Sequence, residues 1–313
     1  MAEPPAPLAL SRRNFLLFSA AGLALAVSGC AKKPGLPRVG LALGGGGAKG
    51  LAHILMLEAL DDLGVRPHII SGTSIGAIIG SLYAAGLSGK EIRALIEQFF
   101  VDKKAPGQEL FALPKSIRWL DFIDPTLAEG GLLDSSDFIK YMGEVLPTTR
   151  FKQLKIPLKV VAAELLTGKQ VVIDSGDLLP ALKASMAVPG VFAPVKWKDL
   201  TLVDGGVANP LPYDLVETGS DLVIAVDVSG SREPENGKTL SSLGVLLQSF
   251  HNMGNNIVAE KLKRVRPSIY IRPEILNVKV LEFYKAREIF AAAQPAQLQL
   301  RTELKKALRA YAG

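Results

Sequence analysis

The chain has 313 residues, of which 48% are apolar and 21% are charged, and its formal net charge is +6 at pH 7. The positive charge is spread along the sequence and is not gathered in a basic arm, which argues against a dedicated nucleic-acid binder and is compatible with mild attraction to anionic lipid. A single cysteine excludes an intramolecular disulfide. We assume one large α/β domain, because the length alone does not decide between one core and two.

The first thirty residues have the pattern of an export signal. Arg12 and Arg13 precede an apolar stretch over residues 17–27, and small residues lead from there to Cys30. Such a stretch is too short to cross a bilayer, which takes about 20 residues. The twin arginine resembles the signal for twin-arginine export, and the segment ending at Cys30 resembles a bacterial lipobox. An uncleaved N-terminal membrane helix is the alternative.

These patterns predict a lipoprotein signal peptide over residues 1–29 and a mature chain that begins with an acylated Cys30. Residues 30–37 would form a lipidated tether, since they contain prolines and a glycine that a helix would not accept. Because each buried CH₂ contributes about 0.8 kcal/mol, several acyl chains hold a protein firmly at a membrane. We expect an exported bacterial lipoprotein that faces the periplasm. Lys32 favours the outer membrane under the enterobacterial sorting convention.

Two strand–loop–helix units open the globular part of the chain. An apolar run over residues 39–43 predicts a strand, and after the glycines at 44–47 apolar residues recur at helical spacing from 51 to 60. In the second unit, a strand over 67–70 leads through residues 72–76 into an apolar helix that ends at Gly86. Ser88 and Glu91 form a capping box, which predicts a further helix through residue 99.

The rest of the chain alternates strands with helices. We expect a lid or insert over 102–130, helices over 134–146 and 178–186, strands over 158–163, 170–173, 200–203 and 222–228, and long helical segments over 240–265 and 281–311. This alternation predicts a mainly parallel sheet covered on both faces, with functional residues at the carboxyl ends of its strands.

The segment Gly72-Thr73-Ser74-Ile75-Gly76 has the form of a nucleophile elbow. Small flanking residues allow a tight turn from strand to helix, which leaves the serine hydroxyl exposed at the start of the helix. The amino end of that helix favours negative charge that develops beside it. Ser74 is therefore the candidate nucleophile.

Gly45, Gly46 and Gly47 lie in a second glycine-rich loop, whose N–H groups are suited to cradle an oxyanion. Together with Gly50 this loop also fits a dinucleotide-binding fingerprint. That fold needs an acidic residue about 20 positions further on, at the tip of the second strand, where this chain has the serine elbow. A Walker loop is excluded because no Ser or Thr follows Lys49. We therefore expect no bound nucleotide.

Four blocks in this order resemble the patatin-like phospholipase family. The loop over 45–50 matches the family's oxyanion motif, residues 72–76 its nucleophile motif, and Asp204-Gly205-Gly206 its DG[AG] motif. Residues 184–194 resemble a further block that lies upstream of the aspartate in many members. Lys49 stands where many members have arginine.

The resemblance covers about residues 39–217 and implies a three-layer α/β sandwich. On this basis residues 38–217 form the catalytic domain, and residues 218–313 add a final strand and C-terminal helices to the same globule. The family implies hydrolysis of acyl esters of membrane lipids, with no metal and no cofactor, and leaves protein partners unknown. The site residues that it implies are Ser74 as nucleophile, Asp204 as proton acceptor, Gly45, Gly46, Gly47 and Ile75 as the oxyanion hole, and the motif glycines Gly50, Gly72, Gly76, Gly205 and Gly206.

The choice of Asp204 as base leaves two alternatives open. An aspartate with an ordinary pKa near 3.9 is a poor base for an alcohol, so oxyanion donors would have to supply much of the rate. Ser74, Asp204 and His251 occur in the chain order of an α/β-hydrolase triad, which makes His251 the rival base. His53 and His68 are interpreted as structural. A hypothesis of another class is a non-catalytic, membrane-anchored lipid-binding lipoprotein with the same fold.

Overall fold

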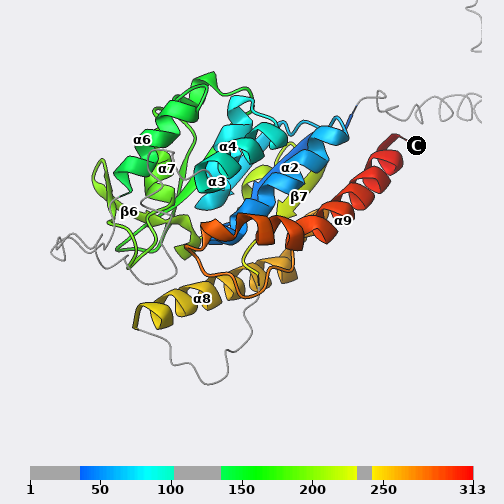
Figure 1. Cartoon of the computed structure of the whole chain (residues 1–313). Coiled ribbons are helices and arrows are strands. Elements are labelled where there is room, and N and C mark those ends of the chain that lie inside the picture. Colours follow the sequence, from blue (N-terminus) through cyan, green and yellow to red (C-terminus); the bar gives the residue numbers. More distant parts are fainter. Residues whose placement is uncertain (1–35, 102–134, 231–241, 313) are drawn as a thin grey trace, which may run out of the picture. The chain divides into compact units, whose positions relative to one another are not determined.

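The computed structural model describes residues 36–101, 135–230 and 242–312 (Figure 1). The predicted signal peptide, Cys30 and the predicted insert over 102–130 lie outside these residues. Residues 37–311 cluster into one compact unit. Within the described residues, no helix has both the length and the apolar character needed to cross a membrane.

A sheet of eight strands forms the centre of the described fold. Five strands run parallel to their neighbours in the spatial order β3 (Leu158–Glu164), β2 (Ile69–Thr73), β1 (Val39–Leu43), β7 (Leu222–Val226) and β8 (Ile269–Ile271). Three antiparallel pairs complete the sheet: β4 (Gln170–Ile173) and β6 (Leu200–Asp204) each pair with β3, and β5 (Val195–Trp197) pairs with β6. The predicted α/β class with a mainly parallel sheet is confirmed. The sequence did not predict β5 and β8, because three residues are too few to establish a period.

Both faces of the sheet are covered by buried apolar side chains. Residues along β1 and β7 alternate between two separate hydrophobic clusters, as side chains on successive strand positions must. Leu41, Leu43, Ile224 and Val226 join the larger cluster, together with residues of α2 (Ala52–Asp62), α3 (Ile75–Ala85) and α9 (Ala286–Ala312). Ala42, Val223 and Ala225 join the smaller one, together with Val258 of α8 (Ser242–Arg264) and residues of the 3₁₀ helix η6 (Tyr213–Val216).

The remaining helices of the described chain match the predicted segments to within a few residues. They are α4 (Gly89–Val101), α6 (Ser136–Val145) and α7 (Leu178–Ser185). The capping box before α4 is confirmed, since Ser88 N–H donates to the Glu91 carboxylate at 2.7 Å and Glu91 N–H donates to the Ser88 hydroxyl at 3.3 Å. The predicted segment 281–311 is split, with a short 3₁₀ helix, η7 (Phe283–Lys285), before α9 begins.

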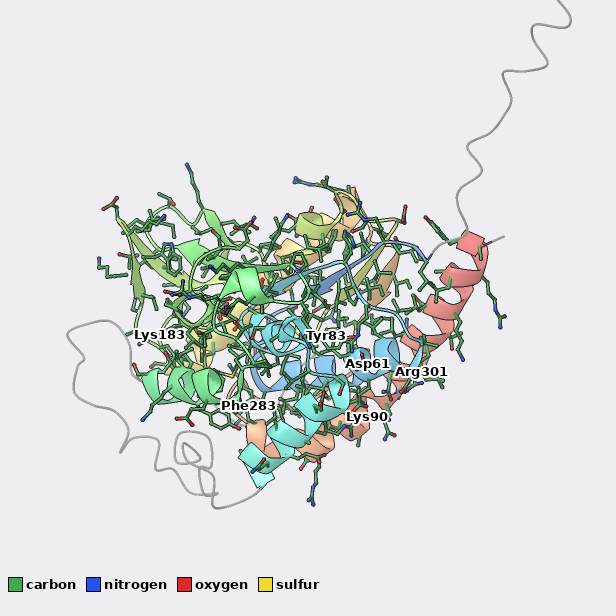
Figure 2. The ribbon with its side chains drawn as sticks, turned by 90° about the horizontal axis from the view of Figure 1, so that it is seen from above. Asp61, Tyr83, Lys90, Lys183, Phe283 and Arg301 are labelled. Carbon is green, nitrogen blue, oxygen red and sulfur yellow. The ribbon has the colours of Figure 1, made fainter. Side chains whose placement is uncertain are left out.

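Asp61, near the end of α2, joins three helices. Its carboxylate accepts hydrogen bonds from the Tyr83 hydroxyl on α3 at 2.8 Å and from the Gly89 N–H on α4 at 2.7 Å. Figure 2 shows the Tyr83 and Asp61 side chains next to each other. These bonds fix the carboxyl end of α3, the helix whose amino end follows Ser74.

Candidate active site

Ser74 occupies the turn between β2 and α3, where the sequence placed a nucleophile elbow. Its φ of 54° and ψ of −124° lie outside the regions that L-residues favour, at a cost of about 1–3 kcal/mol. Glycines on either side permit the turn: a Cβ on Gly76 would lie 2.1 Å from the Leu43 carbonyl oxygen, and one on Gly72 would lie 2.6 Å from the Ala77 nitrogen. The serine is held in a strained conformation that the surrounding backbone imposes.

The pairing of β3 brings Asp204 next to this turn. One edge of β3 is occupied by β4. On the opposite edge, Val161 of β3 pairs with Thr73 of β2. The next residue of β3, Ala162, pairs with Asp204 of β6. The carboxyl ends of β2 and β6 therefore meet at neighbouring positions of one strand. This juxtaposition joins two residues that are far apart in the sequence.

The Asp204 side chain is buried, with 2% of the residue exposed. Its Oδ1 accepts a hydrogen bond from the Gly206 N–H at 2.7 Å, whereas its Oδ2 has no hydrogen-bond partner among the described residues. Burial raises the pKa of the Asp204 carboxyl to about 6, although the adjacent Ser74 hydroxyl and the Gly206 N–H favour the charged form. The ordinary pKa assumed from the sequence is therefore too low, because a sequence does not reveal burial.

The glycine-rich loop after β1 lies against the elbow, and a Cβ on Gly45 would be 3.5 Å from the Ser74 Cβ. The Gly45 N–H, however, donates to the Pro210 carbonyl at 2.9 Å. Because this N–H already has an acceptor, the structure favours the neighbouring N–H groups over Gly45 as donors to an oxyanion. The N–H groups of Gly46, Gly47 and Ile75 have no acceptor within the described ranges, and they remain the candidate donors.

Other motif glycines allow main chains and side chains to approach closely. A Cβ on Gly50 would lie 2.2 Å from the Ile75 Cγ2, and one on Gly205 would lie 2.3 Å from the Val161 carbonyl oxygen. Gly46 is restricted in the same way, because a Cβ there would lie 2.4 Å from the Val228 carbonyl oxygen. Side chains at these positions would displace the loop or the elbow.

Sequence reasoning missed the role of Ser185, the last residue of α7. Its side chain is fully buried. The Ser185 hydroxyl accepts a hydrogen bond from the Ser74 N–H at 2.9 Å and donates one to the Val161 carbonyl at 2.6 Å. The only signal in the sequence was its position in the block over 184–194.

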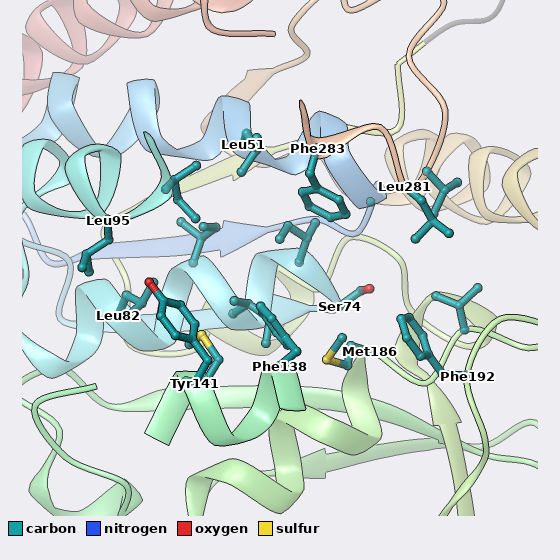
Figure 3. A pocket seen from close by; sticks show the side chains of 18 of the residues that line it. Leu51, Ser74, Leu82, Leu95, Phe138, Tyr141, Met186, Phe192, Leu281 and Phe283 are labelled. Carbon is teal, nitrogen blue, oxygen red and sulfur yellow. The ribbon is translucent and has the colours of Figure 1, made fainter. Parts of the chain in front are cut away.

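An apolar cavity opens beside Ser74, and its volume is about 840 Å³ counted with the open mouth. Figure 3 shows Ser74 on the same side of the view as Leu281 and Phe192, with Leu95 and Tyr141 on the opposite side. One wall is an apolar face of α3 at helical spacing, formed by Ile75, Ile78, Ile79 and Leu82. The facing wall comes from α6 and consists of Phe138, Tyr141, Met142 and Val145. The sequence analysis predicted an apolar helix here but no cavity, because periodicity alone does not distinguish a packed face from a cavity wall.

The rival base His251 lies on α8. Its Nε2 accepts a hydrogen bond from the Asn255 side-chain amide at 3.0 Å, and none joins it to Ser74 or Asp204 in the described part of the chain. Burial, and then the positive charges of Lys49 and Arg272, lower the pKa of His251 to about 4. This arrangement gives no support to a triad.

The other two histidines hydrogen-bond to main-chain carbonyls, as the structural interpretation predicted. His53 Nε2–H donates to the Gly44 carbonyl at 2.8 Å, and burial lowers the pKa of His53 to about 4. His68 Nδ1–H donates to the Val39 carbonyl at 2.9 Å. Among the residues described, no group of three or more His, Cys, Asp or Glu side chains is arranged to hold a metal ion.

Comparison with known sequences gives a family and several relatives. A family model described as patatin-like phospholipase matches residues 41–216. An uncharacterised NTE family protein of Mycobacterium tuberculosis is 36% identical over 196 residues, which are 62% of this chain and 50% of the relative. A lysophospholipase of Scheffersomyces stipitis is 27% identical over 275 residues, which are 80% of this chain and 17% of the relative. The chain thus spans about half the length of the mycobacterial relative.

Comparison with solved structures gives more distant likenesses. VipD from Legionella pneumophila aligns with a TM-score of 0.47 and 17% identity, over 85% of this chain and 67% of that one. Human GIVD cytosolic phospholipase A2 aligns with a TM-score of 0.42 and 12% identity, over 95% of this chain and 64% of that one.

Proposed function

The chain belongs to the patatin-like phospholipase family, and from this premise we propose that it is a serine acyl hydrolase that cleaves acyl esters of membrane lipids. The observation that carries the proposal is the strained Ser74 beside the buried carboxyl of Asp204, in the lining of an apolar cavity. Phospholipid, lysophospholipid and simpler esters all fall within this class.

In the proposed reaction, the Ser74 oxygen attacks the carbonyl carbon of the ester while Asp204 accepts the hydroxyl proton. The negative charge that develops on the carbonyl oxygen is stabilised by the N–H groups of Gly46, Gly47 and Ile75 and by the amino end of α3. Asp204 then returns the proton to the leaving alcohol. Asp204 next deprotonates a water molecule, which attacks the acyl carbonyl carbon and releases the acyl group as a carboxylic acid, while the proton on Asp204 passes back to the departing Ser74 oxygen.

The raised pKa of Asp204 supports its role as base. General bases work best when their pKa lies near the working pH, and a carboxyl with a pKa of about 6 is closer to that condition than an ordinary aspartate. The unpartnered Oδ2 leaves an acceptor position on the carboxylate. Both properties follow from the same burial.

The cavity beside Ser74 is suited to an acyl chain. Its lining is apolar apart from Ser74, the backbone of Gly47 and the Tyr141 hydroxyl, as is common for sites that bind apolar ligands. The α3 wall extends from Ile75 to Leu82, a length on the order of 10 Å along the helix axis. An ester held at Ser74 would bury its hydrocarbon chain along this wall.

Labelling with a serine-directed fluorophosphonate tests the proposal. We expect the parent protein and Ser81→Ala to be labelled and to hydrolyse a short-chain p-nitrophenyl ester, and Ser74→Ala to do neither. Ser81 is a matched control, because it is also a buried serine of the same segment, but its hydroxyl bonds to the Ile78 carbonyl of its own helix. Absence of labelling and turnover in a folded parent protein would favour the non-catalytic lipid-binding alternative.

The second part of the proposal concerns location: an exported lipoprotein anchored at the periplasmic side of a membrane through acylated Cys30. It rests on the signal-like sequence of residues 1–29 alone. In a bacterial host that processes lipoproteins, the mature chain should begin at Cys30 and partition into detergent. Cys30→Ala should abolish that partitioning, and an unmodified Cys30 found by mass spectrometry would contradict the anchor.

A further inference from the structure

We propose that Ser185 is a positioning residue, which fixes the main chain of the nucleophile, Ser74, relative to the main chain of the base, Asp204. The inference rests on the proposed Ser74–Asp204 chemistry and adds a residue to it. Ser185 does not touch the reacting atoms; it acts through the Ser74 main chain.

The first observation is the pair of hydrogen bonds that the Ser185 hydroxyl makes. It accepts from the Ser74 N–H at 2.9 Å and donates to the Val161 carbonyl at 2.6 Å. Both bonds are fully buried, so water does not replace either partner. The hydroxyl therefore connects the strained turn directly to the strand whose edge also carries Asp204.

The second observation is the contact that the same segment makes with the base. Two residues after Ser185, the Ala187 carbonyl accepts a hydrogen bond from the Asp204 N–H at 2.9 Å. One short segment at the end of α7 thus binds the main chain of the nucleophile through a side chain and the main chain of the base through a carbonyl.

The conformation of Ser74 explains why such a contact is needed. Its φ of 54° places the residue where an L-amino acid does not stay without external constraint. The Ser74 N–H also precedes the first turn of α3, where helices leave N–H groups without internal partners. The Ser185 hydroxyl meets both requirements, whereas an alanine would leave the N–H unbonded and the turn free to relax.

The test compares Ser185→Ala with Ser81→Ala, each of which removes one fully buried serine hydroxyl. For parent and variants, kcat and KM are measured with a short-chain ester, together with the rate of fluorophosphonate labelling and Tm. Ser185→Ala should lower kcat and the labelling rate on the order of 10²-fold, the effect of about 1 Å of misplacement, with KM almost unchanged because the cavity is intact. Ser81→Ala should lose a similar amount of Tm while its kcat stays at the parent value.

The outcomes separate this inference from the function on which it rests. A parent protein without labelling overturns the proposed function itself. A labelled parent with Ser185→Ala labelled at the same rate overturns only the positioning role. If Ser185→Ala does not fold, Ser185→Cys replaces it, because a thiol fits a similar space but accepts hydrogen bonds weakly. A folded Ser185→Cys protein that labels at the parent rate overturns the role equally.

Discussion

Two aspartates at strand ends of the same sheet are almost equally buried, yet their surroundings differ. Asp227, just after β7, accepts hydrogen bonds from the Tyr270 hydroxyl at 2.6 Å and the Ser229 N–H at 2.9 Å, and the Arg272 guanidinium lies 3.8 Å from its Oδ2. Asp204, at the end of β6, has one main-chain hydrogen bond and an Oδ2 without a partner among the described residues. Their exposed fractions are 3% and 2%.

The difference separates a structural carboxylate from the one that we propose as the base. A buried carboxylate is stabilised when each of its oxygens accepts hydrogen bonds, as in Asp227. A buried carboxylate that lacks donors is costly to keep ionised, and its proton affinity rises. Burial of Asp204 therefore destabilises the native protein when the carboxyl is ionised, which is the state that the proposed reaction uses.

The largest effect is expected when the proposed base loses its charge. Asp204→Asn keeps the shape of the side chain but cannot accept the Ser74 proton, so ester turnover should decrease on the order of 10³-fold or more. Turnover of a short-chain ester is measured after circular dichroism has established that the variant is folded. Parent-like turnover in a folded Asp204→Asn protein would remove Asp204 from the mechanism.

The corresponding change at the structural carboxylate should act on stability. Asp227→Ala leaves the Tyr270 hydroxyl and the Ser229 N–H without their acceptor, which should lower the free energy of unfolding by about 3 kcal/mol. Arg272 adds little to this value, because its side chain is 41% exposed. Urea unfolding measures the loss, and turnover per folded molecule should remain near the parent value. A clear loss of turnover per folded molecule would instead give Asp227 a role in the reaction.

Asp204→Asn should also change the free energy of unfolding, but it should raise this value where Asp227→Ala lowers it. Because the folded pKa of Asp204 is raised from 3.8 to about 6, the native state binds this proton more tightly than the unfolded state. The parent protein therefore loses stability as pH rises from about 4 to about 6, on the order of 3 kcal/mol in total, and the loss persists above that range.

The asparagine variant lacks this titration, so its advantage over the parent should be present at pH 8 and small near pH 4. Urea unfolding of both proteins at the two pH values measures the difference. An advantage of the same size at both pH values would indicate a packing effect and not the buried charge.

The smallest expected effect is that of His251→Ala. Turnover of the parent should decrease as pH falls through about 6, where Asp204 takes up a proton, and His251→Ala should show the same acid limb and nearly the same rate. A histidine base with a pKa of about 4 would instead keep the rate level down to about that pH. Loss of turnover in a folded His251→Ala protein would instead favour a triad with His251 as the base.

The local parts of the fold and site were predictable from the sequence. The strand over 39–43, the elbow at Ser74 and the capping box at Ser88 depend on residues within a few positions of one another. Their hydrogen bonds and turns follow from nearby glycines and polar side chains. Such features leave a pattern that can be read without any knowledge of distant contacts.

The parts that were missed depend on contacts between distant segments. The bond from the Ser74 N–H to Ser185 spans 111 positions, and the bond that engages the Gly45 N–H reaches Pro210. The proton affinity of Asp204 depends on how many donors the folded chain leaves around it. None of these has a local pattern, so no periodicity or motif predicts them.

The shared edge of β3 makes the assembly of the site a question of strand register. Each residue of a strand advances the chain by about 3.3 Å and reverses the side on which the side chain lies. A slip of one position in the pairing of β2 or β6 with β3 would therefore separate Ser74 from Asp204 and turn one of them to the wrong face. Molecules with a misaligned sheet would be inactive even when compact, so the active fraction of a refolded sample should report how many molecules have reached the native register.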